Sequence, residues 1–461
     1  MSALLWPKST TNLASYRLAL RRLSTANSLS SSHRFIPSHR DDIEDVEDYH
    51  LGGLHPISLG DTFSQKRYKV LHKLGCGGSS TTWLARNPNG QLISLKVMRA
   101  DVSSKPFDKI PEIDISGKLS EYIRRTNAPA RANIQVLDDH FTVSGPNGTH
   151  LCLVTPLAGP SIVSVLHGRI CYGRIEGSVR FRKDIARKIS NQIARGLALM
   201  HSAGVVHGDL TSSNILFKIK PHVAMWRDEE VALHFGKPKT EKVLTVDESS
   251  PAPHAPLRLV APVDDSALPL SIFQPDDILI TDFGQSFSIT HPPADYTPAT
   301  VMHYLSPEAY FDGKIGPASD IWSLACLLFE IRAGYPLFGD FFGSFDAVLA
   351  NMVDTLGQFP EPWWSAFESR HLFFDEEGRR KPRLGEDIGD TSIQGKLERI
   401  GVNDSRPPRG GNGPIMEPLR KKMDGQEIRL FTDLLEKMLR FNAEERPTID
   451  EVISHPWFAF D

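Results

Sequence analysis

The chain has 461 residues, of which 40% are hydrophobic and 23% are charged, and its formal net charge at pH 7 is −4. These are ordinary values for a globular protein, and the length allows two or three lobes with cores of their own. The weak negative charge gives no electrostatic reason to expect binding to nucleic acid or to an anionic membrane. The longest apolar run, residues 321–331, is too short to span a bilayer and predicts a buried helix.

The cysteines are few and stand far apart in the sequence, without a Cys-x-x-Cys pair: Cys76, Cys152, Cys171 and Cys326. This spacing argues against a zinc site and against a disulfide framework. It is typical of a protein from a reducing compartment.

The first 40 residues differ in composition from the rest of the chain. They are rich in arginine and serine and contain no acidic residue before Asp41. This composition predicts either a mitochondrial transit peptide or a disordered basic tail. We expect the acidic run 41–48 to be a linker or the solvated start of a helix, within a lead-in that covers residues 41–67.

Globular sequence begins at Tyr68, where strand and helix patterns start to alternate. Strands are expected over residues 68–86, 91–98 and 150–159, and helices over residues 111–125 and 184–204, with most of the chain after residue 290 helical. Two stretches interrupt this alternation of strand and helix patterns because they are rich in proline or in loop residues. Residues 219–275 and 375–425 are therefore predicted to be insertions.

The segment LGCGGSST, residues 74–81, lies between two expected strands. Glycines at positions 75 and 77 let the backbone approach phosphate oxygens, which backbone N–H groups can bind. By itself, a glycine-rich hairpin is more often an ordinary turn. If this segment covers a nucleotide, the residues expected to contact it are Leu74, Gly75, Cys76, Gly77, Gly78, Ser79, Ser80 and Thr82.

Lys96 strengthens that interpretation because it lies in an otherwise apolar strand. A lysine in such a place is costly unless it meets a carboxylate or a phosphate. The next expected helix begins with Glu112, and a Lys96–Glu112 pair would hold the ammonium over the α- and β-phosphates. Asp114 and Glu121 are alternative partners.

Two later segments supply groups for phosphoryl transfer. In HGDLTSSN, Asp209 can accept or orient the proton of an attacking hydroxyl, and Asn214 can bind a metal ion. In ILITDFGQSF, an apolar strand ends at Asp282, whose carboxylate can bridge Mg²⁺ to the phosphates. Each segment is weak evidence alone, but their order along the chain indicates a single phosphoryl-transfer site.

Together with Gly284, these residues resemble the motif positions of the protein-kinase family. The HGD spelling also resembles the aminoglycoside or choline phosphotransferases, which are small-molecule kinases. The C-terminal half favours protein kinases, because YLSPEAY (304–310) resembles their Ala-Pro-Glu segment and EERPTIDEVISHPWF their closing arginine motif. The resemblance implies an ion pair between Glu308 and Arg446. It also implies an α+β fold with two lobes, a small β-rich N-lobe and a larger helical C-lobe.

Within that family the chain resembles the SR-protein kinases, especially their fungal relatives. The likeness covers roughly residues 45–460 and includes the lead-in DYHLGGLHP and the stretch HLCLVTPLAGPSI. It implies a kinase domain over residues 68–458, with its N-lobe at about 68–155 and its C-lobe at about 159–458.

The same likeness implies which residues form the hinge. Thr155 is expected to be the gatekeeper, and the segment from Pro156 to Ala158 is expected to contact adenine. Ser80 stands where most kinases have the third glycine of the loop.

Three positions depart from the family pattern. Gly208 replaces the arginine that holds a phosphorylated activation loop, so we expect activity not to require such phosphorylation. Thr211 replaces a lysine that contacts the γ-phosphate, and Val301 replaces a threonine that contacts the catalytic aspartate, a role that Thr300 could take. These changes predict either slower transfer in a rewired site or a pseudokinase, and the presence of the lysine, the base and both metal ligands favours an active enzyme.

The resemblance implies a serine/threonine protein kinase that uses ATP and Mg²⁺ and acts on protein substrates, with Arg-Ser-rich splicing-type proteins as one expected class. Asp209, Lys96 and Asn214 are the expected catalytic residues, and Asn214 and Asp282 the metal ligands. A pseudokinase scaffold remains an alternative, and a small-molecule phosphotransferase a less favoured one. We expect a monomer with no direct nucleic-acid partner and no membrane span. The family suggests cytoplasm and nucleus, whereas residues 1–40 suggest a mitochondrion.

Overall fold

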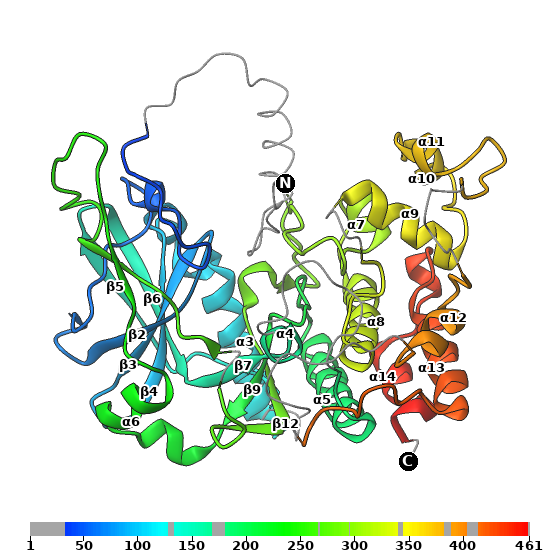
Figure 1. The fold of residues 1–461 in the computed structure, drawn as a ribbon, viewed down its shortest axis with the longest axis horizontal. Helices are drawn as coiled ribbons and strands as arrows, with labels where there is room; N and C mark the ends of the chain where they lie inside the picture. The colour runs from blue at the N-terminus through cyan, green and yellow to red at the C-terminus, as the bar shows by residue number, and fades with distance from the viewer. Residues whose placement is uncertain are drawn as a thin grey trace.

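The computed structural model shows two lobes side by side, one built mainly of strands and the other of helices (Figure 1). This arrangement confirms the predicted two-lobed α+β fold. The structure describes residues 33–127, 133–167, 180–265, 268–294, 296–339, 344–381, 389–402 and 414–459.

A six-stranded antiparallel sheet, ordered β1-β2-β3-β4-β6-β5, forms the small lobe. Alternate residues of a strand face opposite sides of a sheet. Leu95 and Val97 accordingly enter the small-lobe core beside Trp83, and Lys96 between them lies on the other face. The strands are β1 (Thr62–Phe63), β2 (Tyr68–Gly77), β3 (Ser80–Arg86), β4 (Leu92–Met98), β5 (Asp139–Gly145) and β6 (Gly148–Pro156).

Helix α3 (Pro111–Thr126) lies between this sheet and the large lobe (Figure 1). Pro111 occupies the first turn, where its missing N–H leaves no hydrogen bond unmade. Ile115 and Leu119 are buried in the core that continues into the large lobe. Two short elements precede α3, namely α2 (Ala100–Ser103) and η2 (Phe107–Lys109).

The large lobe is organised around helix α8 (Pro317–Ala333), in which every residue from Ser319 to Ala333 is buried. Helix α5 (Lys183–Ser202) packs against α8. The other helical elements of the described chain in this lobe are α4 (Ile162–His167), α7 (Pro307–Phe311), α9 (Phe345–Leu356), α10 (Trp363–Ala366), α11 (Arg370–Phe373), α12 (Ile393–Arg399), α13 (Gly425–Met438), η7 (Ala443–Glu445), α14 (Ile449–Ile453) and η8 (Pro456–Ala459).

Two small antiparallel sheets lie where the lobes meet and position the predicted catalytic segments. One has the order β12-β9-β7, and the other pairs β13 with β8. Residues 207–214 connect β8 to β9, and residues 281–286 connect β12 to β13. Because both connections run between the same two sheets, they are brought together. The strands are β7 (Ala158–Ser161), β8 (Val205–Val206), β9 (Ile215–Ile219), β12 (Phe273–Ile280) and β13 (Phe287–Ser288), with η6 (Phe283–Gln285) before β13.

The segment from residue 33 to residue 54, named here the N-terminal arm, packs on the small lobe. Its Glu44 is buried and forms an ion pair with the buried Lys73 of β2, and Tyr49 Oη donates to Glu44 Oε1 at 2.6 Å. A short helical element, capped by Asp45, does begin within the acidic run 41–48, but Glu44 is not solvated as expected. The acid at position 44 neutralises a buried lysine, a long-range partner that a local charge pattern does not reveal.

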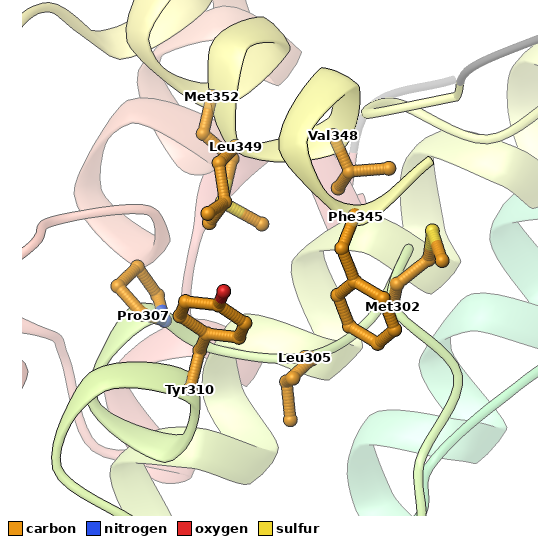
Figure 2. Close-up of a pocket in the computed structure, with 8 residues that line it drawn as sticks. All are labelled: Met302, Leu305, Pro307, Tyr310, Phe345, Val348, Leu349 and Met352. Carbon is orange, nitrogen blue, oxygen red and sulfur yellow. The ribbon is translucent and has the colours of Figure 1, made fainter. Parts of the chain in front are cut away.

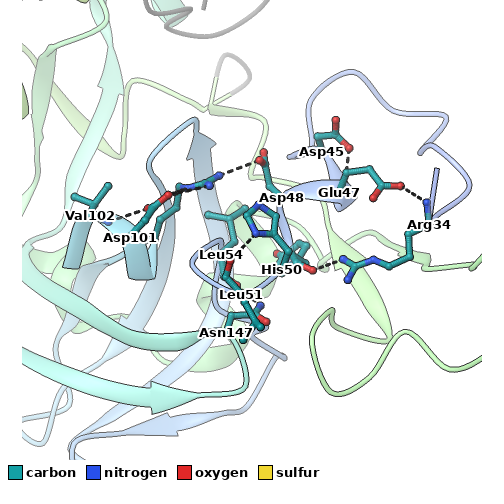
Figure 3. A network of polar contacts seen from close by, with 12 residues as sticks. Arg34, Asp45, Glu47, Asp48, His50, Leu51, Leu54, Asp101, Val102 and Asn147 are labelled. Atoms are coloured by element: carbon teal, nitrogen blue, oxygen red, sulfur yellow. Dashed lines mark hydrogen bonds and ion pairs between the residues drawn. The ribbon is translucent and has the colours of Figure 1, made fainter. Parts of the chain in front are cut away.

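Further polar contacts tie the arm to the small lobe (Figure 3). Asp48 Oδ1 accepts a hydrogen bond from Arg99 Nη1 at 2.9 Å. Asn147 Nδ2, in the turn between β5 and β6, donates to Leu54 O at 2.6 Å. The arm includes the short element η1 (Val46–Asp48). Of the predicted basic segment 1–40, residues 1–32 lie outside the described residues, and Phe35 is buried between the arm and the predicted insertion 219–275.

The predicted insertion 219–275 packs on the small lobe and on the N-terminal arm, and its Val260 is part of the small-lobe core. Trp226 and Val231 pack against Leu84 of β3, and Leu259 packs against Phe35 of the N-terminal arm. The insertion therefore completes the small-lobe core. Its elements are η4 (Pro221–Met225), α6 (Asp228–His234), β10 (Thr240–Lys242) and β11 (Arg258–Val260), with β12 beginning at its end.

The second predicted insertion, 375–425, contains helix α12 in its described part. Ile393 and Leu397 of α12 are buried in the large-lobe core. Within the described ranges, no helix is long and apolar enough to cross a membrane. Cys76, Cys152 and Cys326 are free thiols, and Cys171 lies outside the described residues.

Candidate active site

Three charged side chains meet between the lobes. Lys96 Nζ lies 2.9 Å from Asp282 Oδ1 and 3.7 Å from Glu112 Oε1. Asp114 and Glu121, the alternative partners, form ion pairs with cations of their own helix. Glu112 is therefore the α3 carboxylate that pairs with Lys96.

The charges of this cluster stabilise one another. Burial alone would lower the pKa of the Lys96 ammonium, but the carboxylates of Asp282 and Glu112 raise it above its ordinary value. The Lys96 cation in turn lowers the pKa of Asp282, against the effect of burial. Lys96 thus remains cationic and Asp282 anionic near neutral pH, which are the states needed to bind phosphate and metal respectively.

The glycine-rich segment joins β2 to β3, with Gly75 opposite Thr82 and Gly77 opposite Ser80. Gly78 and Ser79 form the exposed turn, whereas Ser80 is buried. A Cβ added at any of these three glycines would meet no atom within 4 Å. The loop therefore has open space around it, as a nucleotide-covering loop requires, and the contacts of Leu74 to Thr82 with ATP stay a prediction.

Cys76 lies within this loop but is not a reactive thiol. It is partly buried, and its Sγ lies 3.9 Å from Asp42 O of the N-terminal arm. Burial raises the pKa of the thiol to about 11, so the thiolate is scarce at neutral pH.

The predicted hinge residues lie where the chain passes from β6 of the small lobe to β7. Thr155 pairs in register with Ser94 of β4, and Pro156 is the last residue of β6. Pro156 O accepts a hydrogen bond from Gln135 Nε2 at 2.8 Å. Pro156 also pairs in register with Ile93 of β4. The adenine contacts of Pro156 and Ala158 stay predictions.

Asp209 and Asn214 lie together in the connection between β8 and β9. Asn214 Nδ2 donates to Asp209 Oδ2 at 2.9 Å and to Asp209 O at 2.8 Å. Burial raises the pKa of Asp209 to about 7; the Thr300 hydroxyl and the Asn214 amide lower it, and the Asp282 charge raises it. A carboxyl that titrates near neutrality suits a general base at physiological pH.

Two carboxylates of the buried helix α8 hold this loop. Asp320 accepts the backbone N–H groups of His207 at 2.8 Å and of Gly208 at 2.9 Å. Glu330 Oε1 accepts a hydrogen bond from Ser212 Oγ at 3.2 Å. The sequence analysis missed both acids. The available signal was their position inside an apolar helix, where a buried charge needs a partner.

The Asp-Phe-Gly segment is held by close packing. Phe283 is buried in the large-lobe core, with its ring centroid 6.0 Å from that of His207. A Cβ on Gly284 would lie 2.9 Å from Glu112 Oε1. Glycine at this position therefore lets α3 bring Glu112 close to Lys96.

The predicted pair between Glu308 and Arg446 forms. Arg446 Nη1 and Nη2 donate to Glu308 Oε1 and Oε2 at 2.8 and 2.7 Å, and Ser319 Oγ of α8 donates to Oε1 at 2.8 Å. Burial alone would raise the pKa of Glu308, but the guanidinium lowers it below its ordinary value. The bidentate pair fixes the end of the activation segment, defined here as residues 282–308, to the helical lobe.

A protein kinase domain matches residues 68–246 and 270–458 of the chain. The chain belongs to the protein kinase family. The break between the two matched ranges lies inside the predicted insertion 219–275.

The relatives of this kinase include several that act on serine and threonine by name. It is 24% identical over 428 residues to the serine/threonine-protein kinase SRPK of Physarum polycephalum, covering 90% of this chain and 91% of that relative. It is 32% identical over 209 residues to protein kinase dsk1 of Schizosaccharomyces pombe, a match that covers 45% of this chain and 35% of that relative. It is 22% identical over 546 aligned positions to SRSF protein kinase 3 of Homo sapiens, covering 90% of each. The chain is a serine/threonine protein kinase of the SR-protein-kinase type, as predicted.

The structure shows which residue approaches Asp209 where Val301 replaces the threonine of the family pattern. The side chain of Val301 is 36% exposed, whereas Thr300 is 5% exposed and its hydroxyl lies near enough to Asp209 to lower the pKa of that carboxyl. Among the described side chains, Thr300 Oγ1 makes no hydrogen bond of standard geometry. A threonine thus approaches the predicted base from one position earlier in the sequence. The departure at Thr211 remains, because this buried residue provides no cation.

The segment that follows Val301 is anchored on helix α9 of the kinase through apolar side chains (Figure 2). Met302 and Leu305 face Phe345 and Leu349 across a cavity of about 10 Å³. This is about the volume that one water molecule needs. The contact is therefore a nearly complete packing surface and leaves no room for a nucleotide.

Proposed function

We propose that this kinase transfers the γ-phosphate of ATP to serine or threonine hydroxyls of a protein substrate. The observation that carries the proposal is the arrangement between the lobes of a cation, a base and two oxygen ligands. Lys96, held by Glu112, would bind the α- and β-phosphates beneath the glycine-rich loop. Asp209 would position the substrate hydroxyl beside them.

The residues present fit a magnesium ion. The amide nitrogen of Asn214 is engaged by Asp209, which leaves its carbonyl oxygen for a cation. Asp282 keeps an anionic carboxylate, and its side chain is 45% exposed to the space between the lobes. Mg²⁺ prefers such oxygen ligands and usually shares them with the substrate phosphates. In this proposal Asn214 and Asp282 hold the ion, which supplies charge neutralisation when bound.

Asp209 carries the proton chemistry in the proposed reaction. As the substrate oxygen bonds to the γ-phosphorus, the bond from that phosphorus to the β–γ bridging oxygen breaks, and ADP leaves. The hydroxyl proton passes to Asp209 Oδ, and the base must be ionised beforehand. Burial raises the pKa of Asp209 to about 7, which suits this carboxyl to accept a proton near neutral pH.

Labelled ATP tests this proposal directly. Asp209→Ala is expected to keep nucleotide binding but to lower transfer on the order of 10²- to 10⁴-fold. Lys96→Met should weaken both, whereas the exposed Lys105→Met serves as a charge-matched control. Transfer at the wild-type rate by Asp209→Ala would show that the proposed mechanism is wrong.

The proposed substrate class is Arg-Ser-rich protein. The support is the similarity to relatives that include an SRSF protein kinase. An Arg-Ser repeat protein should be phosphorylated faster than the same repeat with every arginine changed to alanine. Choline and an aminoglycoside, offered in parallel, test the small-molecule alternative. Magnesium-dependent nucleotide binding without any transfer would favour the pseudokinase alternative.

Gly208 also supports activity without phosphorylation of the activation segment. It offers no cation to pair with a phosphate at that point. We expect enzymatic removal of all phosphate to leave the rate on an Arg-Ser substrate within about twofold of that of untreated enzyme. A large loss of rate that returns on rephosphorylation would contradict this expectation.

A further inference from the structure

Gly208 directly precedes Asp209, and its surroundings admit no side chain. Its φ is +77°, in the left-handed region that favours glycine. A Cβ built there would lie 2.5 Å from Tyr296 Oη and 2.6 Å from Gln285 O, both too close for a carbon atom. The space that a side chain at position 208 would need is occupied by a tyrosine of the activation segment.

Tyr296 packs against the first part of the activation segment, around residues 285–287. Tyr296 Oη donates to Gln285 O at 2.9 Å, and its ring packs edge-on against Phe287, with centroids 4.9 Å apart. Ser286, which lies between Gln285 and Phe287 in the sequence, donates through its Oγ to His207 O at 2.8 Å. The tyrosine therefore contacts the stretch that is itself hydrogen-bonded to residues 207–214, named here the catalytic loop.

The electrostatic surroundings further disfavour ionisation of the Tyr296 hydroxyl, which is neutral at its ordinary pKa. Burial raises its pKa, and the nearby carboxylates of Asp320 and Asp209 raise it further. A neutral hydroxyl donates a hydrogen bond without adding charge beside these acids.

We propose that Tyr296 is a positioning residue for phosphoryl transfer: it clamps the activation segment onto Gly208 and so fixes the backbone that carries Asp209. The inference rests on the proposed function, because it assigns Asp209 the role given above. The clamp acts in the place of a side chain at position 208. It also accounts for glycine at that position, since any larger residue would displace Tyr296.

Two substitutions separate the hydroxyl from the ring. Tyr296→Phe removes one hydrogen bond and should lower kcat by up to about tenfold. Tyr296→Ala removes the whole clamp and should lower kcat on the order of 10²-fold, the cost of a small misplacement of a reacting group. The KM for ATP should stay within about twofold, because Lys96 and Glu112 are untouched. His291→Ala, an exposed change in the same segment, should leave kcat unchanged.

A double-mutant comparison tests whether Gly208 and Tyr296 act together. Gly208→Ala should lower kcat strongly in the wild-type background. In the Tyr296→Ala background the added loss should be smaller, since one of the two clashing groups is gone. A wild-type kcat for Tyr296→Ala, or independent losses that simply multiply, would overturn the proposal.

Hydrogen exchange supplies a readout that does not depend on catalysis. Backbone amides of residues 205–212 and 284–288 should exchange faster in Tyr296→Ala than in the wild type, while His291→Ala behaves as the wild type does. If the wild-type protein fails to phosphorylate any substrate, the proposed function fails, and faster exchange in Tyr296→Ala would still support the clamp. Unchanged exchange in that variant would overturn the clamp whatever the activity.

Discussion

Asp209 shows how much the chemistry of one residue depends on its surroundings. As an aspartate in water it would be fully ionised at neutral pH. In the folded kinase, burial raises its pKa to about 7, although Thr300 and Asn214 partly oppose this rise. The residue is thereby poised to take a proton, at a cost in stability.

Replacing Asp209 by asparagine should separate that cost from the catalytic role. We expect Asp209→Asn to lower kcat on the order of 10²- to 10⁴-fold. A folded-state pKa raised to about 7 means that the wild type loses stability as pH rises toward 7, because the unfolded chain ionises first. Asparagine does not titrate, so the Tm difference between variant and wild type should be larger at pH 8 than at pH 5.

Melting curves at both pH values check this prediction. The exposed Asp108→Asn is the matched control and should show no such pH-dependent difference. A Tm difference between Asp209→Asn and the wild type that is the same at pH 5 and pH 8 would contradict the raised pKa.

Thr300 should tune the same pKa. Removing its hydroxyl in Thr300→Ala is expected to raise the pKa of Asp209 further, because the hydroxyl favours the ionised carboxyl. The acidic limb of the kcat/KM profile should move to higher pH, with more activity lost at pH 6.5 than at pH 8.5. The neighbouring Val301→Ala should leave that limb in place, and an equal shift in both variants would refute the assignment.

At the scale of elements, the N-terminal arm and strand β2 form one unit. Lys73 and Glu44 are both buried, and Lys73 Nζ lies 5.5 Å from the centroid of the Trp83 ring. A buried ion pair gives little net stability relative to apolar residues, but removing one partner leaves an uncompensated buried charge. The arm is therefore required to neutralise the strand that leads into the glycine-rich loop.

Glu44→Gln should destabilise the small lobe by about 3 to 5 kcal/mol. Urea unfolding and the KM for ATP measure the effect on the lobe and on the loop. Glu44→Leu combined with Lys73→Met should recover most of the lost stability, since no charge is then buried. The exposed Asp41→Asn is the control and should leave stability unchanged. If Glu44→Gln lost as little stability as Asp41→Asn, the ion pair of Glu44 with Lys73 would be unimportant.

At the scale of the whole molecule, helix α8 is the scaffold on which separate parts of the site are mounted. Its Asp320 and Glu330 hold the catalytic loop. Its Ser319 contacts Glu308, which Arg446 holds from the last helical region of the chain. Helix α8 thereby holds segments that are more than a hundred positions apart in the sequence, such as those of His207 and Asp320 or of Glu308 and Arg446, at fixed positions relative to one another.

Glu308→Gln should therefore affect stability and activity together. Arg446 would be left buried without a counter-ion, at a cost of about 3 to 5 kcal/mol. We expect a lower Tm and a lower kcat, both nearly insensitive to salt because a buried pair is poorly screened. The exposed Glu444→Gln is the control for loss of one negative charge, and equal melting temperatures for the two variants would argue against the anchoring role.

The sequence by itself determined the class of fold and most of the site. Glycine spacing, a lysine in an apolar strand and an aspartate at a strand end are local patterns, and their order restricts them to one kind of enzyme. The pair of Lys96 with Glu112 was predictable because a lysine in an apolar strand needs a carboxylate and the next helix begins with Glu112. The family resemblance supplied the pair of Glu308 with Arg446. Local periodicity likewise predicted the helices over residues 111–125 and 184–204, which form as α3 and α5.

Only the tertiary structure decided the contacts between distant segments. The burial of Glu44 against Lys73, the support of the loop by Asp320 and the seat of Tyr296 over Gly208 all join residues from different elements. The approach of Thr300 to Asp209 depends on the path of the activation segment. Nothing in a local pattern of charge or hydrophobicity encodes which distant group will neutralise a buried charge, since that choice is made when the elements pack.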